Sequence, residues 1–420
     1  MSTPRSPWGR GTPATEPLLG RHTADVVVVG GGVAGLTLAH RLRRDLPEAK
    51  LVLLEAVSVG GGATGHSTGL ARPGVWGSMR LLRRRAGPAA ADAMTRASLA
   101  GMAALRELVT TEGIDCDLVS GRMFQVPVTA AHVDRYTADL PELNRLGMRA
   151  EWLDRHPHGA LRVEPLYQLD PLRLCLGLRE LLLARGVAVH EGSAVRQVVP
   201  GEPVLVRTDH AEVRASQVVL AVDGYAGAFG LPVVPLRSQA LCTEPIPGPA
   251  PLAPGDLLID SRAFFNYARL GPDNRLILGG GRAANPRAVP GRMPHVEAAT
   301  WRRLERELHA LFPTLAGIRV ERHWAGVSGA TPDWMPVVGR VDRGVWFEGG
   351  WNGRGFAPAL HSAGWLAGQL AAALHGRPAP PPELPWHRGR VRTLPVLNRL
   401  RYPLRQAFLD LSDRRSLARK

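Results

Sequence analysis

The feature that most constrains the fold is a complete βαβ unit near the start of the sequence. DVVVV at 25–29 is a short, unbroken apolar run, which is typical of a strand buried on both faces of a parallel sheet. A helical pattern follows over 33–46 and stops before Pro47, and LVLLE at 51–55 is the second strand. Two parallel strands joined through a helix predict an α/β fold.

The turn between the first strand and the helix carries a glycine fingerprint. Gly30, Gly32 and Gly35 fit the pattern G-x-G-x-x-G, and Glu55 follows the last of them by twenty residues. The first glycine permits the tight turn, the second lets the backbone approach a pyrophosphate, and the third lets the helix pack on the strand. The acid can accept hydrogen bonds from ribose hydroxyls, which disfavours NADP. The residues assigned to dinucleotide binding are Gly30, Gly32, Val33, Ala34, Gly35 and Glu55.

Two further glycine-rich stretches favour FAD over NAD as the dinucleotide. GGGATGHSTGL at 60–70 lies where a flavin's ribityl chain and ring would run beyond the pyrophosphate. The stretch 344–364 is another strand, glycine turn and helix, and a helix N-terminus there would stabilise the negative charge of a reduced flavin. The further residues assigned to FAD are Gly62, Ala63, Thr64, His66, Ser67, Thr68, Gly69, Val195, Gly326, Gly353, Arg354, Gly355 and Phe356.

The length and the cysteine usage bound the class of protein. At 420 residues the chain is expected to form two domains. Cys116, Cys175 and Cys242 are far apart and have no CxxC spacing, which argues against a disulfide scaffold or a metal site and for a reducing compartment. No apolar run is long enough to span a membrane, and the N-terminus lacks the apolar region of a secretory signal. We therefore expect a cytoplasmic protein.

The formal charge of +15 is a weak signal for nucleic acid in this sequence. Only Lys50 and Lys420 are lysines among 52 basic residues, so the chain uses arginine throughout. Residues 388–420 carry a net charge of +8, about half of the total, and the remainder is only mildly basic. That tail contains Pro395 and Pro403 and has no aromatic-rich platform for bases, so the pattern argues against nucleic acid as the main partner.

Four stretches in order make the chain resemble the D-amino-acid-oxidase-like family of FAD-dependent amine oxidoreductases. They are DVVVVGGGVAGL, GGGATGHSTGL, YARLGPDNRLILGGG, and WAGVSGATPDWMPVVG followed by FEGGWNGRGFAPAL. The resemblance covers about residues 24–375, and it is strongest to gamma-glutamylputrescine oxidases, glycine oxidases, and dimethylglycine or sarcosine dehydrogenases.

The resemblance implies a Rossmann-like FAD-binding domain built from discontinuous segments, with an inserted antiparallel-sheet α+β substrate domain. A Pro-rich segment from Pro232 to Pro254 agrees with a crossing between two such domains. The remaining parts are expected to be a mobile leader and a Pro-rich linker with the basic tail. The expected ranges are 1–23 for the leader; 24–105, 150–231 and 325–376 for the FAD-binding domain; 106–149 and 232–324 for the substrate domain; and 377–420 for the linker and tail.

The reaction implied by the resemblance is oxidation of a C–H bond next to an amine nitrogen. A hydride would pass from the amine or amino acid to the flavin N5, the imine would be hydrolysed, and O2 or another acceptor would take the electrons. Arg269 matches the arginine that some family members use for a substrate carboxylate, a task that suits a guanidinium. Tyr267 is on the same face of the strand, and Trp351 and Asn352 lie in the turn expected near the flavin. These four residues are the catalytic candidates.

Two positions decide finer points within the family. Gly62, Thr64, His66, Gly69 and Leu70 keep the G-x-T-x-H-x-x-G-L spacing in which some dehydrogenases bond a histidine covalently to the flavin 8α-methyl group. Those dehydrogenases have a tryptophan in place of Gly65, so a histidine that only contacts the cofactor stays as the alternative.

The second position is the lysine with which sarcosine-oxidase-type members activate oxygen. The corresponding residue here is Ile277, which leaves both oxidase and dehydrogenase activity open. Two alternatives to amine oxidation are also open: a flavoprotein that modifies tRNA through the basic tail, as one branch of the family does, and a non-catalytic flavin-binding module.

Overall fold

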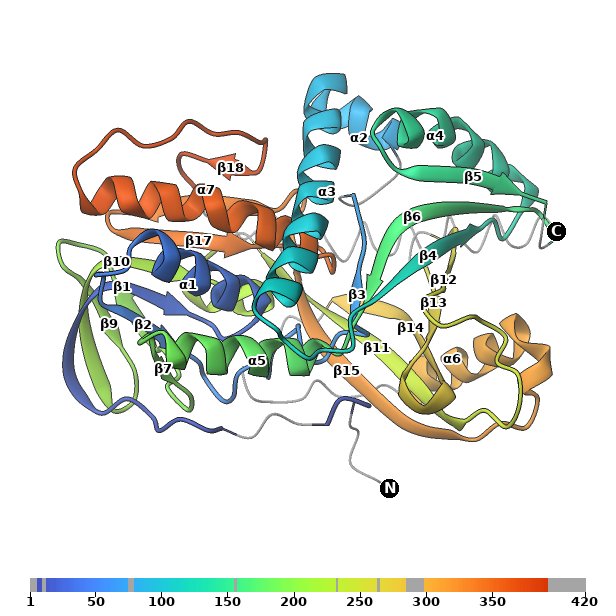
Figure 1. The fold of residues 1–420 in the computed structure, drawn as a ribbon, viewed down its shortest axis with the longest axis horizontal. Helices are drawn as coiled ribbons and strands as arrows, with labels where there is room; N and C mark the ends of the chain where they lie inside the picture. The colour runs from blue at the N-terminus through green and yellow to red at the C-terminus, as the bar shows by residue number, and fades with distance from the viewer. Residues whose placement is uncertain are drawn as a thin grey trace.

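The computed structural model describes residues 6–9, 13–74, 79–154, 157–231, 233–262, 265–284 and 298–391. Its strands form two large sheets, and helices cover them (Figure 1). Within the described residues, no helix is long and apolar enough to cross a membrane.

The first sheet has the parallel centre that the βαβ unit predicts. Its described strands run in the order β18-β16-β17-β10-β1-β2-β7, and a β8–β9 hairpin is attached to β10. β1 pairs in parallel with both β2 and β10, and β10 pairs in parallel with β17. The strands are β1 (Gly20–Val29), β2 (Leu51–Leu54), β7 (Ala188–His190), β8 (Gln197–Val199), β9 (Val204–Arg207), β10 (Ala211–Leu220), β16 (Val337–Asp342), β17 (Val345–Gly349) and β18 (His387–Arg388).

The apolar run of β1 is buried on both faces of this sheet. Val26 and Val28 belong to one hydrophobic cluster, and Val27 and Val29 belong to another, because successive side chains of a strand point to opposite faces. Helices cover the first of these faces, and Figure 1 shows α1, α5 and α7 in front of the sheet. These helices and α3, which packs on α7, are α1 (Val33–Asp45), α3 (Pro88–Thr111), α5 (Pro171–Ala184) and α7 (Phe356–Leu374).

The second sheet is antiparallel except where β12 pairs in parallel with β4. Its described strands run in the order β15-β11-β14-β13-β12-β4-β6-β3, and β5 pairs with β6. The strands are β3 (Leu70–Ala71), β4 (Val119–Val126), β5 (Arg149–Leu153), β6 (Ala160–Gln168), β11 (Val234–Pro245), β12 (Leu257–Asp260), β13 (Tyr267–Leu270), β14 (Arg275–Ala284) and β15 (Val320–Ala330). The helices near it are α2 (Met79–Ala86), α4 (Val133–Arg145) and α6 (Ala298–Leu311). The mixed α/β fold with a second, largely antiparallel sheet agrees with the expected fold class.

The chain passes between the two sheets more often than the sequence indicates. β5 and β6 pair within the second sheet, although we assigned 150–231 to the FAD-binding domain. β15, which includes the start of the segment 325–376, also belongs to the second sheet. Conversely, α3 extends into the range 106–149 while packing on α7. These differences arise because strand pairing is non-local, and a Pro-rich segment marks only one of the crossings.

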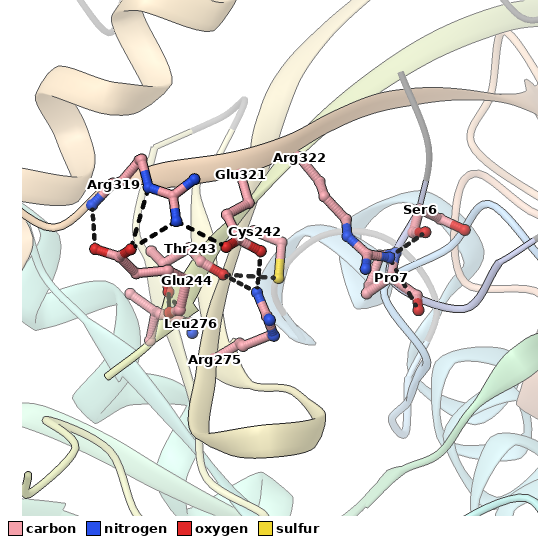
Figure 2. Close-up of polar contacts among 10 residues, drawn as sticks. All are labelled: Ser6, Pro7, Cys242, Thr243, Glu244, Arg275, Leu276, Arg319, Glu321 and Arg322. Atoms are coloured by element: carbon pink, nitrogen blue, oxygen red, sulfur yellow. Dashed lines mark hydrogen bonds and ion pairs between the residues drawn. The ribbon is translucent and has the colours of Figure 1, made fainter. Parts of the chain in front are cut away.

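The leader is not wholly mobile, because its described part is bonded to the body of the protein. Trp8 is buried and donates its indole N–H to the carbonyl of Ser67 at 2.8 Å. The backbone N–H of Ala14 donates to the Glu191 carboxylate at 2.8 Å. Arg322 of β15 donates to the carbonyl of Ser6 at 3.3 Å, as Figure 2 shows. Most of the basic tail, from residue 392 onward, lies outside the described residues.

Ion pairs tie together three strands of the second sheet beside this contact (Figure 2). Arg275 of β14 pairs with Glu321 of β15 at 2.5 Å. Arg319, just before β15, pairs with Glu244 of β11 at 3.0 Å and with Glu321 at 3.1 Å. Arg319 is exposed while Arg275 and Glu321 are half-buried, and pairs near the surface add little stability singly. Their consequence here is to hold the strand ends in register.

Candidate active site

A cavity of about 460 Å³ joins the two sheets. Its walls come from the end of β1, the loop 60–70, the strands β11 and β15, and the turn before α7. Cavities of this size that join an α/β sheet to a second sheet are common ligand sites. All the residues that we assigned to the cofactor line it except Gly35 and Gly69, and of the catalytic candidates Tyr267 and Trp351 line it.

The glycines of the fingerprint are required by close contacts between backbones. Gly30 has φ +116°, and a Cβ there would lie 2.6 Å from the carbonyl oxygen of Ala221. A Cβ on Gly35 would lie 2.1 Å from the carbonyl oxygen of Gly30. Gly35 therefore acts by packing α1 against the turn, outside the cavity, as the fingerprint predicts for its third glycine.

The N-terminus of α1 opens toward the cavity and suits an anion. Its N-cap residue, Gly32, supplies no side-chain hydrogen bond. The N–H of Val33 donates to the hydroxyl of Thr64 at 3.1 Å, so the loop 60–70 meets the helix end directly. The N–H groups of a helix start and its partial positive charge suit a pyrophosphate. The residues present therefore fit the diphosphate of a dinucleotide.

Glu55 lies just past the carboxyl end of β2, at the cavity wall. Its carboxylate accepts hydrogen bonds from the N–H of Gly31 at 2.7 Å and of Val57 at 3.0 Å. Burial raises the pKa of Glu55, and the hydrogen bond from Gly31 opposes that rise. The carboxylate is thus held beside the fingerprint glycines, where ribose hydroxyls would meet it.

The loop 60–70 is held against β15, and His66 lies at that contact. The Trp324 indole N–H donates to the carbonyl of His66 at 3.0 Å, and a Cβ on Gly326 would lie 3.0 Å from the Cβ of His66. Nδ1 of His66 is 2.9 Å from the carbonyl oxygen of Gly62. Because a carbonyl only accepts, Nδ1 carries a hydrogen, and in the neutral ring Nε2 holds the lone pair.

Trp324 and Ile277 belong to one buried apolar cluster beside the contact between the loop 60–70 and β15. Trp324 is 1% exposed, and it also forms part of the cavity wall. Ile277 is fully buried in one apolar cluster with Trp8, Cys242 and Trp324. The position that corresponds to the oxygen-activating lysine therefore holds an apolar side chain in apolar surroundings.

Arg269 does not face the cavity, contrary to the role that we expected for it. The side chain is buried, and Nη1 donates to the carbonyls of Thr68 and Gly69, each at 2.9 Å. Nε donates to the carbonyl of Leu270 at 2.8 Å. Burial lowers the pKa of Arg269 to about 10. The guanidinium thus secures the end of the loop 60–70, because strand alternation sets the face of a residue but not where a long side chain ends.

Gly69 supports the same arrangement from outside the cavity. It has φ +67°, and a Cβ there would lie 2.0 Å from the carbonyl oxygen of Leu169 and 3.0 Å from Nη1 of Arg269. The glycine lets the loop turn and lets the guanidinium reach the backbone. Its role is in shaping the loop rather than in contacting a ligand.

Asn352 shapes the turn before α7 and does not line the cavity. It is 2% exposed and has φ +56°, a conformation that asparagine tolerates better than most residues. Its side chain accepts from the N–H of Thr331 at 3.0 Å and donates to the carbonyl of Gly350 at 2.8 Å. The catalytic assignment of Asn352 is therefore replaced by a structural one.

Asp223 is a cavity residue that the sequence analysis missed. It follows β10, and its carboxylate accepts from the N–H groups of Gly329 at 2.7 Å and Gly350 at 2.9 Å. Burial raises its pKa to about 6. The carboxylate thus joins β15 to the turn before α7. An available signal was its place at the end of a buried strand next to β1, in the stretch LAVDG.

Four arginines also line the cavity, and only Arg354 was among the expected residues. One of them, Arg196, pairs with Asp209 at 2.7 Å. Arg72 follows β3, Arg282 lies in β14, and Arg354 lies in the turn before α7. In a chain with so many arginines, nothing in the local sequence distinguishes Arg72 or Arg282 from a surface residue.

The sequence also matches a known protein family. Residues 25–369 match the family described as FAD dependent oxidoreductase. The chain belongs to this family. The cofactor of the family is FAD, and the glycine turn, the helix N-terminus and the buried carboxylate described above fit its dinucleotide part. The protein is thus an FAD-dependent oxidoreductase, as the sequence resemblance implies.

Individual relatives support the same assignment. The chain is 29% identical over 371 residues to gamma-glutamylputrescine oxidoreductase of Escherichia coli, and the match covers 83% of each protein. It is 29% identical over 367 residues to the tRNA 5-methylaminomethyl-2-thiouridine biosynthesis bifunctional protein of Maricaulis maris, covering 85% of this chain and 54% of that protein. Glycine oxidase from Geobacillus kaustophilus has the same fold, with a TM-score of 0.70 at 20% identity, covering 89% of this chain and all of that one.

Proposed function

We propose that the protein oxidises a carbon–nitrogen bond in a small amine or amino acid. The observation that carries this proposal is the single cavity that extends from the fingerprint turn, past the loop 60–70, to Tyr267 and Trp351. Bound FAD would supply hydride acceptance at its N5 atom, and water would then hydrolyse the imine product. The relatives named above, which include an oxidoreductase of gamma-glutamylputrescine, support an amine as the substrate.

The residues of this chain would contribute binding and exclusion of water rather than proton transfer. Glu55 and the N-terminus of α1 would hold the dinucleotide part of the cofactor. Tyr267 and Trp351 come from β13 and from the turn before α7, and they would form apolar walls around the substrate. Hydride transfer requires a positioned C–H bond in a dry pocket, so these walls would be the main contribution to the rate.

The identity of the compound that takes electrons from the reduced flavin is a separate question. We matched Ile277 with the lysine by which some members of the family activate oxygen, but Ile277 is buried in an apolar cluster and does not line the cavity. Both O2 and another compound therefore stay open as the acceptor. The three cysteines are free and buried, and this supports a place in the reducing cytoplasm.

The tRNA-modifying alternative rests on residues 388–420, most of which lie outside the described residues.

Anaerobic mixing of the FAD-loaded protein with a panel of amines and amino acids tests the proposed reaction. At least one compound should bleach the flavin absorption at about 450 nm, because hydride transfer reduces the flavin. Readmission of O2 then distinguishes an oxidase, in which the colour returns within seconds, from a dehydrogenase, in which it returns only with another acceptor. A panel that leaves the flavin oxidised throughout would favour the non-catalytic module.

A covalent bond between His66 and the flavin 8α-methyl group is a further proposal. The methyl carbon would lose a proton, Nε2 of His66 would add to that carbon, and the flavin, which takes up the electron pair, would be reoxidised by its electron acceptor. The Nδ1 contact with Gly62 leaves Nε2 with the lone pair, and a neutral imidazole is a good nucleophile near pH 7. Acid precipitation of the protein should therefore give a yellow pellet, and the pellet of His66→Ala should be white. If the wild-type pellet is colourless and all FAD is in the supernatant, His66 only contacts the cofactor.

A further inference from the structure

Arg72, Arg282 and Arg354 form a cluster of positive charge on the cavity wall, which we call the arginine cluster. The three side chains come from separate elements: the segment after β3, the strand β14, and the turn before α7. Each is half-buried. No part of the amine oxidation proposed above requires three cations at one place.

The positions of two of these guanidinium groups are set by one aromatic ring. The guanidinium carbon of Arg72 lies 5.1 Å from the centre of the Phe265 ring, and that of Arg282 lies 4.8 Å from it. The two carbons are therefore no more than about 10 Å apart. A Cβ on Gly353, which has φ +75°, would lie 2.8 Å from Nη2 of Arg282, so the glycine turn leaves space for this side chain.

The three arginines disfavour one another's charge. Burial and then the charge of Arg282 lower the pKa of Arg72, together to about 10. The pKa of Arg354 is lowered by burial and then by the charges of Arg72 and Arg282. A ligand that brings negative charge would relieve this repulsion.

The acidic residues of the described cavity wall are engaged by backbone groups. They are Glu55 and Asp223. Glu55 is engaged by the N–H groups of Gly31 and Val57, and Asp223 by those of Gly329 and Gly350. Neither is among the charges that shift the pKa of Arg72 or of Arg354.

We propose that the substrate is an amine bearing two carboxylates, which the arginine cluster binds. One carboxylate needs one or two guanidinium groups for bidentate contacts, so three cations are suited to a dianion. Tyr267 and Trp351 would pack against the carbon chain between the anionic groups. This inference rests on the proposed amine oxidation, and it adds the charge of the substrate to it.

Amino acids that differ only in their second carboxylate test the proposal on the FAD-loaded protein. Glutamate is compared with glutamine, and aspartate with asparagine, in both enantiomers, as the kcat/KM of anaerobic flavin reduction. The better diacid should exceed its amide by at least about 30-fold, the range expected for one buried charge contact. Equal values for acid and amide in an active enzyme overturn the inference.

Variants of Arg282 connect the preference to the cluster. Arg282→Gln should reduce the acid-to-amide ratio at least about tenfold, because one of the three charges is lost. Arg282→Lys should keep most of the ratio, since it keeps the charge. Arg44→Gln is the matched control: its side chain is 60% exposed on α1, and the ratio should be unchanged. A ratio that falls equally in all three variants overturns the assignment to the cluster.

A binding measurement separates this inference from the proposed function. Glutarate and butyrate cannot be oxidised at a carbon–nitrogen bond, and their binding is followed by the shift of the flavin spectrum. Glutarate should bind at least about tenfold more tightly than butyrate, and Arg282→Gln should remove that difference. If this is seen while no amine reduces the flavin, the dianion site stands and the proposed reaction fails. If amines reduce the flavin while the two acids bind equally, the proposed reaction stands and the dianion site fails.

Discussion

Gly35→Ala is expected to leave the purified protein largely without FAD. The new Cβ would lie 2.1 Å from the carbonyl oxygen of Gly30, 3.2 Å from Cγ1 of Val28 and 3.3 Å from the Cβ of Ala221. All three atoms belong to the turn or the strands that carry it, so the start of α1 must move away from the phosphate site. Overpacking of this severity corresponds to a loss of affinity for FAD of at least about tenfold.

Gly364→Ala is the matched control for this substitution. Gly364 lies in the helix α7 away from the cavity wall, and the nearest atom to a Cβ there would be Nη1 of Arg41 at 3.4 Å, an ordinary contact. This variant should keep its FAD, measured as the ratio of absorbance at the flavin and protein bands and by titration of stripped protein. A circular dichroism spectrum of Gly35→Ala shows whether the domain is folded. A folded Gly35→Ala that binds FAD as tightly as Gly364→Ala contradicts the packing role.

Glu348→Gln is expected to stabilise the protein at neutral and alkaline pH. Glu348 lies in β17, is fully buried, and has no hydrogen-bond partner for either carboxylate oxygen within the described structure. Burial raises its pKa from the ordinary value of 4.5 to about 8. The folded protein therefore retains a proton on Glu348 at pH values where the unfolded chain has already released it.

The sign of the pH dependence follows from these two pKa values. Between pH 4.5 and about pH 8 the unfolded chain is progressively favoured, because it alone ionises Glu348; above about pH 8 the difference is constant. At pH 7 the resulting loss in the free energy of unfolding is about 3 kcal/mol. An amide does not ionise, so the variant avoids this loss.

Thermal unfolding between pH 5 and pH 9 measures this effect. The melting temperature of the wild type should fall relative to that of Glu348→Gln as the pH rises from 5 to 8, and the two curves should then run parallel. Glu202→Gln is the control, since Glu202 is exposed and its pKa is lowered by the hydrogen bond from Arg343, so both states are ionised over this range. Parallel curves for wild type and Glu348→Gln over the whole range would show that Glu348 is not buried as a neutral acid.

The parts of the site that could be predicted from the sequence depend on local geometry. One βαβ unit contains the turn at Gly30, the start of α1 and the acid at the end of β2. The apolar pattern and the glycine spacing of this unit predict all three features. The loop 60–70 follows this unit closely, so its place beside the cavity was also predictable. Family membership and the α/β fold, which depend on such local patterns in order, were predicted correctly.

Contacts between segments that are distant in the sequence decide which residues line the substrate end of the cavity. Arg269 and Arg282 both lie in or beside the hairpin of β13 and β14, yet Arg269 donates to backbone carbonyls of the loop 60–70 while Arg282 lines the cavity beside Arg72. Nothing in the local sequence distinguishes these arginines. The tertiary structure decides between them, because a long flexible side chain ends wherever distant segments provide acceptors or leave space.

The sequence by itself determined a βαβ unit with a dinucleotide fingerprint, its glycine positions and the acid at the end of β2. Only the tertiary structure decided how often the chain crosses between the sheets, how the described leader meets the loop 60–70, and which arginines line the cavity. The physical reason is the range of the interactions. Turn and helix geometry act over a few residues and leave a pattern in the chain, whereas strand pairing and side-chain contacts join segments that are hundreds of residues apart.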